Sequence, residues 1–169
     1  MVYIIHKKKG NSNRKIKILT SNPACVLLLD SRVLLEGPKE NKTRRNSMEI
    51  EVINEEFTVC KVKDFSEVDL TDTYCFVGKT DEECSLVCAT EKTPESTIER
   101  EDGWRAFRLK GVLDFSLTGI LAKIADLLAH REISIFAVST YNTDYVLIKK
   151  EQFGRALSVL KEDGYSIAE

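Results

Sequence analysis

Apolar residues follow two different periods along the C-terminal part of the chain. The stretch WRAFRLKG at 104–111 sets apolar residues against charged ones, which is typical of a strand. Apolar residues then recur at helical spacing in a single stripe, formed by Leu117, Ile120, Leu121, Ile124, Leu127 and Leu128. The stretch ISIFAVSTY at 133–141 is apolar on both faces near its middle, which favours a central strand.

The remaining pattern completes an order of six elements. DYVLIKK at 144–150 predicts a strand that forms a hairpin with the preceding one around Asn142 and Thr143. A second amphipathic helix has one apolar face, made by Phe153, Ala156, Leu157 and Leu160, and we expect Gly164 to end it before a last short strand, YSIAE. The order βαββαβ predicts a ferredoxin-like unit, in which two helices cover one face of a four-stranded antiparallel sheet.

The preceding segment predicts a reduced copy of the same unit. EEFTVCKVKD at 55–64 is typical of a strand, and residues 72–89 predict a hairpin with a polar turn. The stretches at the helical positions are poor helix formers, so we expect helices there to be short or absent. The fold class is therefore α+β, with ferredoxin-like repeats in two antiparallel sheets that carry helices on one face. We divide the chain into an extension at 1–47, a reduced domain at 48–103 and a complete domain at 104–169.

Charge separates the extension from the rest of the chain. Residues 1–47 hold eleven basic and three acidic residues, a net charge of +8. The remainder of the chain holds fourteen basic and twenty-four acidic residues, a net charge of −10. The extension is compatible with an arm that binds RNA or an anionic surface. We favour another interpretation, because RRNSM can be encoded as a purine-rich ribosome-binding sequence two codons before an ATG. Met48 is then the start of the protein, and 1–47 is translated upstream DNA.

Composition narrows the classes of function. The chain is 43% hydrophobic and 31% charged, which is typical of a globular protein, and no apolar run approaches the length of a membrane span. The acidic main part argues against nucleic-acid binding. The five cysteines, an odd number without a secretion signal, favour buried reduced thiols over a metal site, and we expect a cytoplasmic protein without a cofactor. No nucleophile–base pair or phosphate loop indicates an enzyme.

Small polar residues gather at two points of the C-terminal unit. One group precedes the first helix, where Asp114, Ser116 and Thr118 lie, and the other forms the hairpin turn with Ser139, Thr140, Asn142, Thr143 and Asp144. The residues around 111–150 resemble the ACT domain, and more closely a family of small stand-alone tandem-ACT proteins. That family is related to the regulatory domains of aspartate kinase and to the animal cytosolic arginine sensor CASTOR. The resemblance covers Phe57 to about Ser166, with specific motifs from Gly103 onward.

The resemblance implies binding of a free amino acid, without catalysis, at an interface between two ACT domains. It places the ligand at the loop and helix start formed by Asp114, Phe115, Ser116, Leu117, Thr118, Gly119 and Ile120, where Thr118-Gly119 replaces the Pro-Gly that is frequent in ACT domains. Unpaired N–H groups at a helix start suit an α-carboxylate, and a glycine lets a ligand approach the backbone. Asp114 and Asp144 are candidates for the ammonium group, although capping and turn formation explain them equally well.

The loop and the turn are expected at opposite ends of a single unit, so that only a facing domain can unite them into one pocket. The first hypothesis is therefore an amino-acid-binding regulatory module that forms a homodimer and acts on another protein. The alternative is a structural interaction domain that dimerises through its sheet edges and binds no small ligand. A concave interface lined by residues 114–120 favours the first hypothesis, and a flat apolar interface favours the second.

Overall fold

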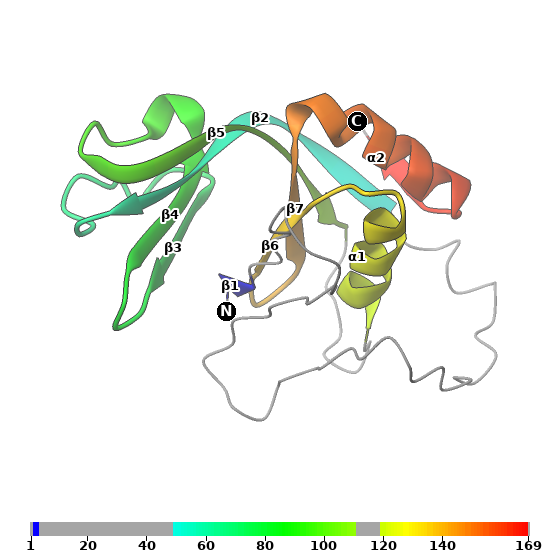
Figure 1. The fold of residues 1–169 in the computed structure, drawn as a ribbon, viewed down its shortest axis with the longest axis horizontal. Coiled ribbons are helices and arrows are strands. Elements are labelled where there is room, and N and C mark those ends of the chain that lie inside the picture. The colour runs from blue at the N-terminus through cyan, green and yellow to red at the C-terminus, as the bar shows by residue number, and fades with distance from the viewer. Residues whose placement is uncertain (1, 4–48, 111–118, 169) are drawn as a thin grey trace.

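The computed structural model describes residues 2–3, 49–110 and 119–168 (Figure 1). The elements follow in the order β1 (Val2–Tyr3), β2 (Glu49–Val62), β3 (Cys75–Lys79), β4 (Cys84–Ala89), the 3-10 helix η3 (Thr90–Lys92), β5 (Thr97–Leu109), α1 (Ile120–His130), β6 (Phe136–Ser139), β7 (Asp144–Lys149), α2 (Lys150–Glu162) and β8 (Ser166–Ala168). The C-terminal unit thus has the expected βαββαβ order.

All described strands belong to one sheet, in the order β1-β6-β7-β5-β2-β4-β3, and β8 pairs in parallel with β2. The α+β class and the ferredoxin-like fold are confirmed. The expectation of two separate sheets is corrected, because β2 and β5 are 14 and 13 residues long and each runs through both halves of the molecule. Figure 1 shows both strands passing along the top of the view from one half to the other.

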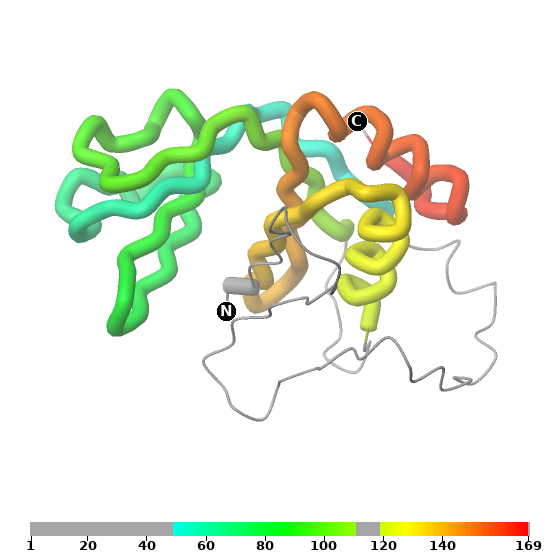
Figure 2. The backbone as a smooth tube through the Cα atoms, in the orientation of Figure 1, coloured from blue at the N-terminus to red at the C-terminus, as the bar shows by residue number. Residues whose placement is uncertain are grey.

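The long strand pair bends where the two halves meet. The antiparallel register of β2 and β5 shifts between Ile53 and Glu56, and again between Phe57 and Val59. Gly103 lies at the second shift and has a φ of +76°, a left-handed conformation that glycine adopts without steric cost. Such bulges bend and twist a strand pair. The bend visible in Figure 2 therefore has a local cause in these irregular positions.

The helices cover one face of the C-terminal half. Phe107 and Leu109 of β5 point toward this layer and are almost fully buried against α1 and α2. The expected apolar stripe supplies Ile124 and Leu128 from α1. After α2, Gly164 has a φ of +99°, and the N–H groups of Gly164 and Tyr165 donate to the carbonyls of Lys161 and Leu160. This pairing is a Schellman motif, and it confirms the expected role of Gly164.

The N-terminal half covers the opposite face. A second core cluster contains Phe57 and Val87 from that half together with Trp104, Phe136 and Leu147 from the strands of the C-terminal half. Two side chains of the β3 region complete it, since Phe76 packs against Tyr145 at 4.9 Å between ring centroids and Tyr74 packs against Phe57 at 5.7 Å. The part of the sheet that belongs to the C-terminal half is therefore covered on both faces.

The two halves use their strands in the same way. The strand order is symmetrical about the β5–β2 pair, so that β2, β3 and β4 correspond to β5, β6 and β7. Among the described residues, the N-terminal half has only η3 where the C-terminal half has α2. The boundary expected between 103 and 104 lies inside β5. The division into two ACT-like domains stays a prediction.

The first two described residues pair with an edge of the sheet. Val2 lies opposite Val138 and Tyr3 opposite Ala137 in an antiparallel ladder between β1 and β6. Val2 and Tyr3 belong to the extension that we expected to stand outside the fold, and the structure pairs them with the sheet. Residues 4–48 lie outside the described part of the chain, and the interpretation of 1–47 stays a prediction.

Candidate functional site

The end of β5 lies beside the turn between β6 and β7. Arg108 of β5 is the register partner of Tyr145, the second residue of β7. The Thr143 hydroxyl in the turn donates a hydrogen bond of 2.6 Å to the backbone carbonyl of Leu109. The described end of β5 therefore lies next to this turn.

This arrangement corrects the expectation that the loop and the turn lie at opposite ends of the unit. The strand before α1 and the strand after it run in the same direction, because β7 pairs antiparallel with both β5 and β6. The C-terminal ends of β5 and β6 consequently reach the same edge of the sheet. No facing domain is needed to bring the end of β5 and the hairpin turn together.

The turn is held by its own threonines. The N–H and the hydroxyl of Thr140 donate to the carbonyl of Thr143 at 2.9 and 2.8 Å, and the N–H of Thr143 donates back to the Thr140 hydroxyl at 3.3 Å. Asp144 accepts a hydrogen bond of 2.5 Å from the Ser139 hydroxyl. The Asp144 carboxylate therefore has a partner within the hairpin, as the turn-forming interpretation of this residue expects.

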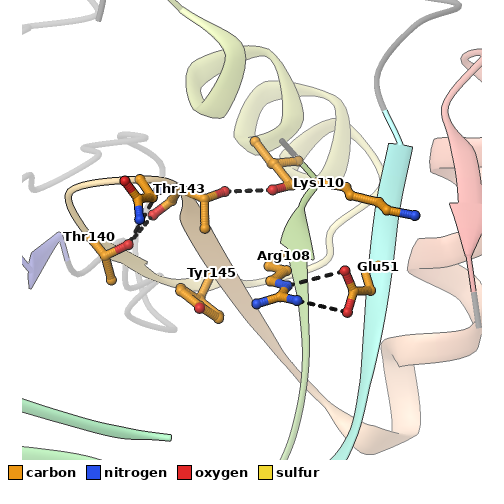
Figure 3. Close-up of a pocket in the computed structure, with 8 residues that line it drawn as sticks. Glu51, Arg108, Lys110, Thr140, Thr143 and Tyr145 are labelled. Carbon is orange, nitrogen blue, oxygen red and sulfur yellow. Dashed lines mark hydrogen bonds and ion pairs between the residues drawn. The ribbon is translucent and has the colours of Figure 1, made fainter. Parts of the chain in front are cut away.

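A cavity of about 210 Å³ opens between this turn and the ends of β2 and β5 (Figure 3). The residues that line it come from four adjacent segments and are Glu51, Arg108, Leu109, Lys110, Thr140, Asn142, Thr143 and Tyr145. Most of these side chains end in a polar or charged group. The cavity thus lies where β5 leads into the segment 111–118 that the sequence singled out.

An ion pair forms one wall of the cavity. Arg108 donates from Nη2 to Glu51 Oε1 at 2.9 Å and from Nε to Glu51 Oε2 at 3.3 Å, and the two residues are register partners on β5 and β2. Figure 3 shows the two side chains facing one another, with Tyr145 beside Arg108. Hydrogen bonds to the Glu51 carboxylate and to the Tyr145 hydroxyl raise the pKa of Arg108 above its usual range. The guanidinium is therefore a permanent cation in the cavity.

Lys110, the residue after β5, is a second cation among the lining residues. The Nζ atom of Lys110 lies 3.0 Å from Glu49 Oε2, and the two side chains are 51% and 38% exposed. The backbone N–H of Lys110 donates to the Glu49 carbonyl at 2.8 Å, which holds the end of β5 against β2. Among the described residues, the side chain is thus held by one exposed ion pair, whereas its backbone is fixed.

The structure brings together part of the expected site. Thr140, Asn142 and Thr143 line the cavity, and Asp144 lies next to it without lining it. Gly119 and Ile120 lie at the start of α1 and do not line the cavity either. The other expected ligand contacts lie outside the described residues: Asp114, Phe115, Ser116, Leu117 and Thr118.

Gly119 has a conformational role in the described structure, and its expected contact with a ligand stays a prediction. It is the N-cap of α1 with a φ of +82°, and no side-chain hydrogen bond caps it. A Cβ atom added there meets no described protein atom within 4 Å, so within the described protein it is the backbone conformation that favours a glycine. Ser116 and Thr118, the two expected caps, lie outside the described part of the chain.

Four functional candidates were not found from the sequence: Glu51, Arg108, Lys110 and Tyr145. Arg108 and Tyr145 belong to strands that the pattern predicted, but charged residues on a strand usually face solvent without a function. Glu51 lies in the stretch EIEVIN, whose alternation of polar and apolar residues is a strand signal that could have been recognised. Its contact with Arg108 depends on the register of two distant strands.

The described cysteines do not contribute to the cavity. Cys60, Cys75, Cys84 and Cys88 are free thiols in the N-terminal half, where Cys60 and Cys88 belong to a small apolar cluster. Burial raises the pKa of the Cys60 thiol to about 11, which keeps it protonated at neutral pH. The described residues contain no group of histidine, cysteine or carboxylate side chains that could hold a metal ion. None of the described helices is long and apolar enough to cross a membrane.

The fold and the cavity define a ferredoxin-like domain with a polar cavity where β5 ends and where β2 and β7 begin. Residues 99–162, from β5 to the end of α2, match the family model of the ACT domain. The chain is thus related to ACT-domain proteins through its C-terminal half.

Curated relatives match the same part of the chain. The bovine cytosolic arginine sensor for mTORC1 subunit 1 is 39% identical over 64 residues, which cover 36% of this chain and 20% of the relative. The human protein of that name is 39% identical over 59 residues, 34% of this chain and 18% of the relative. The chain thus spans about one fifth of the length of these relatives.

Solved structures share the fold over a longer stretch. Protein Atu0741 from Agrobacterium tumefaciens has a TM-score of 0.64 at 23% identity, over 72% of this chain and 92% of its own. The ligand-free regulatory subunit of aspartate kinase from Thermus thermophilus has a TM-score of 0.50 at 12% identity, over 68% of this chain and 95% of its own. At these identities the likeness concerns the fold alone.

Proposed function

We propose that the protein is a non-catalytic regulatory module that binds a free amino acid in the cavity at the end of β5. The observation that carries the proposal is the Arg108–Glu51 ion pair in the wall of this cavity. A free amino acid has a carboxylate and an ammonium group a few ångströms apart. The ion pair offers both complementary charges at a similar spacing, with 36% and 34% of the two side chains exposed.

The surroundings of the ion pair support the same ligand class. The Asn142 side chain and the threonines of the turn add uncharged hydrogen-bonding groups. The expected loop residues Asp114 to Thr118 follow Lys110 directly in sequence, and their ligand contacts remain part of the proposal. No histidine or cysteine is among the described residues that line the cavity, which supports binding over catalysis.

The relationship to ACT domains supports regulation as the purpose of binding. One relative is named as an arginine sensor, and one structural neighbour is a regulatory subunit. We infer that this chain likewise reports the level of an amino acid in the cytoplasm to a separate protein. We also infer a homodimer that completes the ligand site between ACT domains, since edge strands of sheets readily pair with a second copy.

The test is a thermal-shift screen of the full chain against the twenty amino acids. A ligand that binds only the folded state raises the melting temperature by mass action. We expect at least one amino acid to raise it, and we expect Arg108→Gln to remove the shift. The matched control is Lys61→Gln. Lys61 and Glu99 are register partners on β2 and β5 in the N-terminal half, just as Glu51 and Arg108 are in the C-terminal half.

The alternative function is an interaction domain without a small ligand. The N-terminal half exposes three large apolar side chains, Leu70, Val77 and Ile98, which favours a protein contact there. A well-folded protein whose melting temperature responds to no amino acid, and which dimerises in sedimentation equilibrium, supports this alternative and contradicts amino-acid binding.

A further inference from the structure

We infer that the ligand of the cavity is an acidic amino acid, which carries two carboxylates and one ammonium group. The inference rests on the proposed function and adds the class of the side chain. It follows from the charges that line the cavity. Two cations, Arg108 and Lys110, line it together with one carboxylate, that of Glu51. Glu49, the exposed ion-pair partner of Lys110, is not among the described residues that line it. An acidic amino acid has the opposite set of charges.

The uncharged residues of the described lining disfavour an apolar ligand side chain. Leu109 is the one aliphatic side chain among the described residues that line the cavity, and it is only 1% exposed. Thr140, Asn142 and Thr143 add polar groups, and Tyr145 adds a ring that already packs against Phe76. An apolar side chain entering this cavity has almost no apolar surface to cover, so it gains little from leaving water.

Both cations can accept a second carboxylate. Glu51 engages the Nε and Nη2 atoms of Arg108 and the Tyr145 hydroxyl also hydrogen-bonds it, but a guanidinium has about five N–H donors in all. The Lys110–Glu49 pair is exposed on both sides, and such pairs contribute about 0–1 kcal/mol. The Lys110 ammonium can therefore turn toward a ligand at little cost, while Glu51 remains for the ligand's ammonium group.

The N-terminal half supplies an internal comparison. Its hairpin has the same closing hydrogen bond, from the Thr80 N–H to the Glu83 carbonyl at 2.9 Å, as the Thr140–Thr143 turn. Glu83 stands there in place of Thr143, and its carboxylate accepts from the Ser85 hydroxyl at 2.8 Å. This added negative charge disfavours an acidic ligand. Lys63, which follows β2 as Lys110 follows β5, is therefore a matched control position.

The experiment is isothermal titration calorimetry of the full chain with L-glutamate, L-aspartate, L-glutamine, L-asparagine, L-lysine and L-leucine. We expect glutamate or aspartate to bind at least about ten-fold more tightly than its uncharged amide, a difference of about 1.4 kcal/mol. Lys110→Gln should reduce this preference to about two-fold or less. Lys63→Gln should leave it unchanged, and circular dichroism of both variants should match the parent protein.

The outcomes separate this inference from the proposed function. If glutamine, lysine or leucine binds more tightly than the acidic amino acids, the inference is wrong and amino-acid binding stands. If none of the twenty amino acids raises the melting temperature in the thermal-shift screen and none of these six binds in calorimetry, both are wrong. A third outcome is that Lys110→Gln and Lys63→Gln lose the preference for the acidic amino acid over its amide to the same extent. That result also overturns the inference, because it assigns the preference to the overall charge of the protein and not to the cavity.

Discussion

Thr143 links the hairpin turn to the end of β5 through a single side chain. The residue is only 9% exposed, and its hydroxyl is the described partner of the Leu109 carbonyl at 2.6 Å. The bond fixes the end of β5 against the turn. A small polar residue in a turn thereby shapes one end of the cavity.

We expect Thr143→Val to lower the free energy of unfolding by about 1–2 kcal/mol. Valine keeps the shape of threonine but leaves a buried carbonyl oxygen without its partner. Urea denaturation at neutral pH measures the loss. Thr73→Val is the matched control, because Thr73 is exposed and its change should stay within about 0.5 kcal/mol. Equal stability of the two variants contradicts a structural role of the Thr143 bond.

At this scale the sequence predicted the turn but not the ion pair. Thr140, Asn142 and Thr143 are turn residues for reasons of local chemistry, so their position follows from a few neighbours in sequence. Arg108 and Glu51 are 57 residues apart and meet only through the register of β5 on β2. Register depends on the pairing of whole strands, and no local pattern reports which charges it places together.

Among the elements, the two helices end in the same motif with different residues. After α1, the N–H groups of Glu132 and Ile133 donate to the carbonyls of Ala129 and Leu128, as those of Gly164 and Tyr165 do after α2. Glu132 has a φ of +58°, and it is the one non-glycine residue with positive φ in the described part of the chain. A Cβ atom in this conformation is sterically unfavourable.

We expect Glu132→Gly to raise the free energy of unfolding by about 0.5–1 kcal/mol, because glycine relieves this strain. The reciprocal change, Gly164→Ala, should lower it by about 1 kcal/mol, since alanine introduces the same strain after α2. Thermal and urea denaturation of both variants measure the two effects. A decrease for Glu132→Gly shows that a side-chain contact of Glu132 outweighs the backbone strain.

The sequence predicted the helices better than the long strands. The stripe that includes Ile124 and Leu128 is buried as expected, because an amphipathic helix shows its buried face in its own period. The strand expected from 104 onward begins at Thr97, and residues 98–102 of β5 are exposed. An exposed strand has no apolar face, so it leaves no period of two to recognise. This is why the continuous sheet was not anticipated.

At the scale of the whole molecule, the two halves share one sheet and one of its core clusters. β2 and β5 pass through both, and the cluster around Trp104 takes side chains from each half. Trp104 itself packs 6.1 Å from Phe136 between ring centroids, and the Lys149 ammonium lies 4.2 Å from the centre of its ring. The N-terminal half is thus tied to the cavity through Tyr145, which contacts both Phe76 and Arg108.

We expect the described halves to unfold together, because neither has a complete sheet or core alone. Trp104 is the only tryptophan of the chain, so its fluorescence in urea reports the shared core, and far-UV ellipticity reports all strands and helices. The two transitions should coincide.

Phe76→Ala should shift both transitions to lower urea concentration by the same amount, a loss of about 1–3 kcal/mol in the free energy of unfolding. Val77→Ala, on the same strand but 41% exposed, should cost less than about 0.5 kcal/mol. A Phe76→Ala variant whose ellipticity shifts while its fluorescence transition stays in place indicates halves that unfold separately. In that case the contact between β3 and Tyr145 does not connect the N-terminal half to the proposed ligand site.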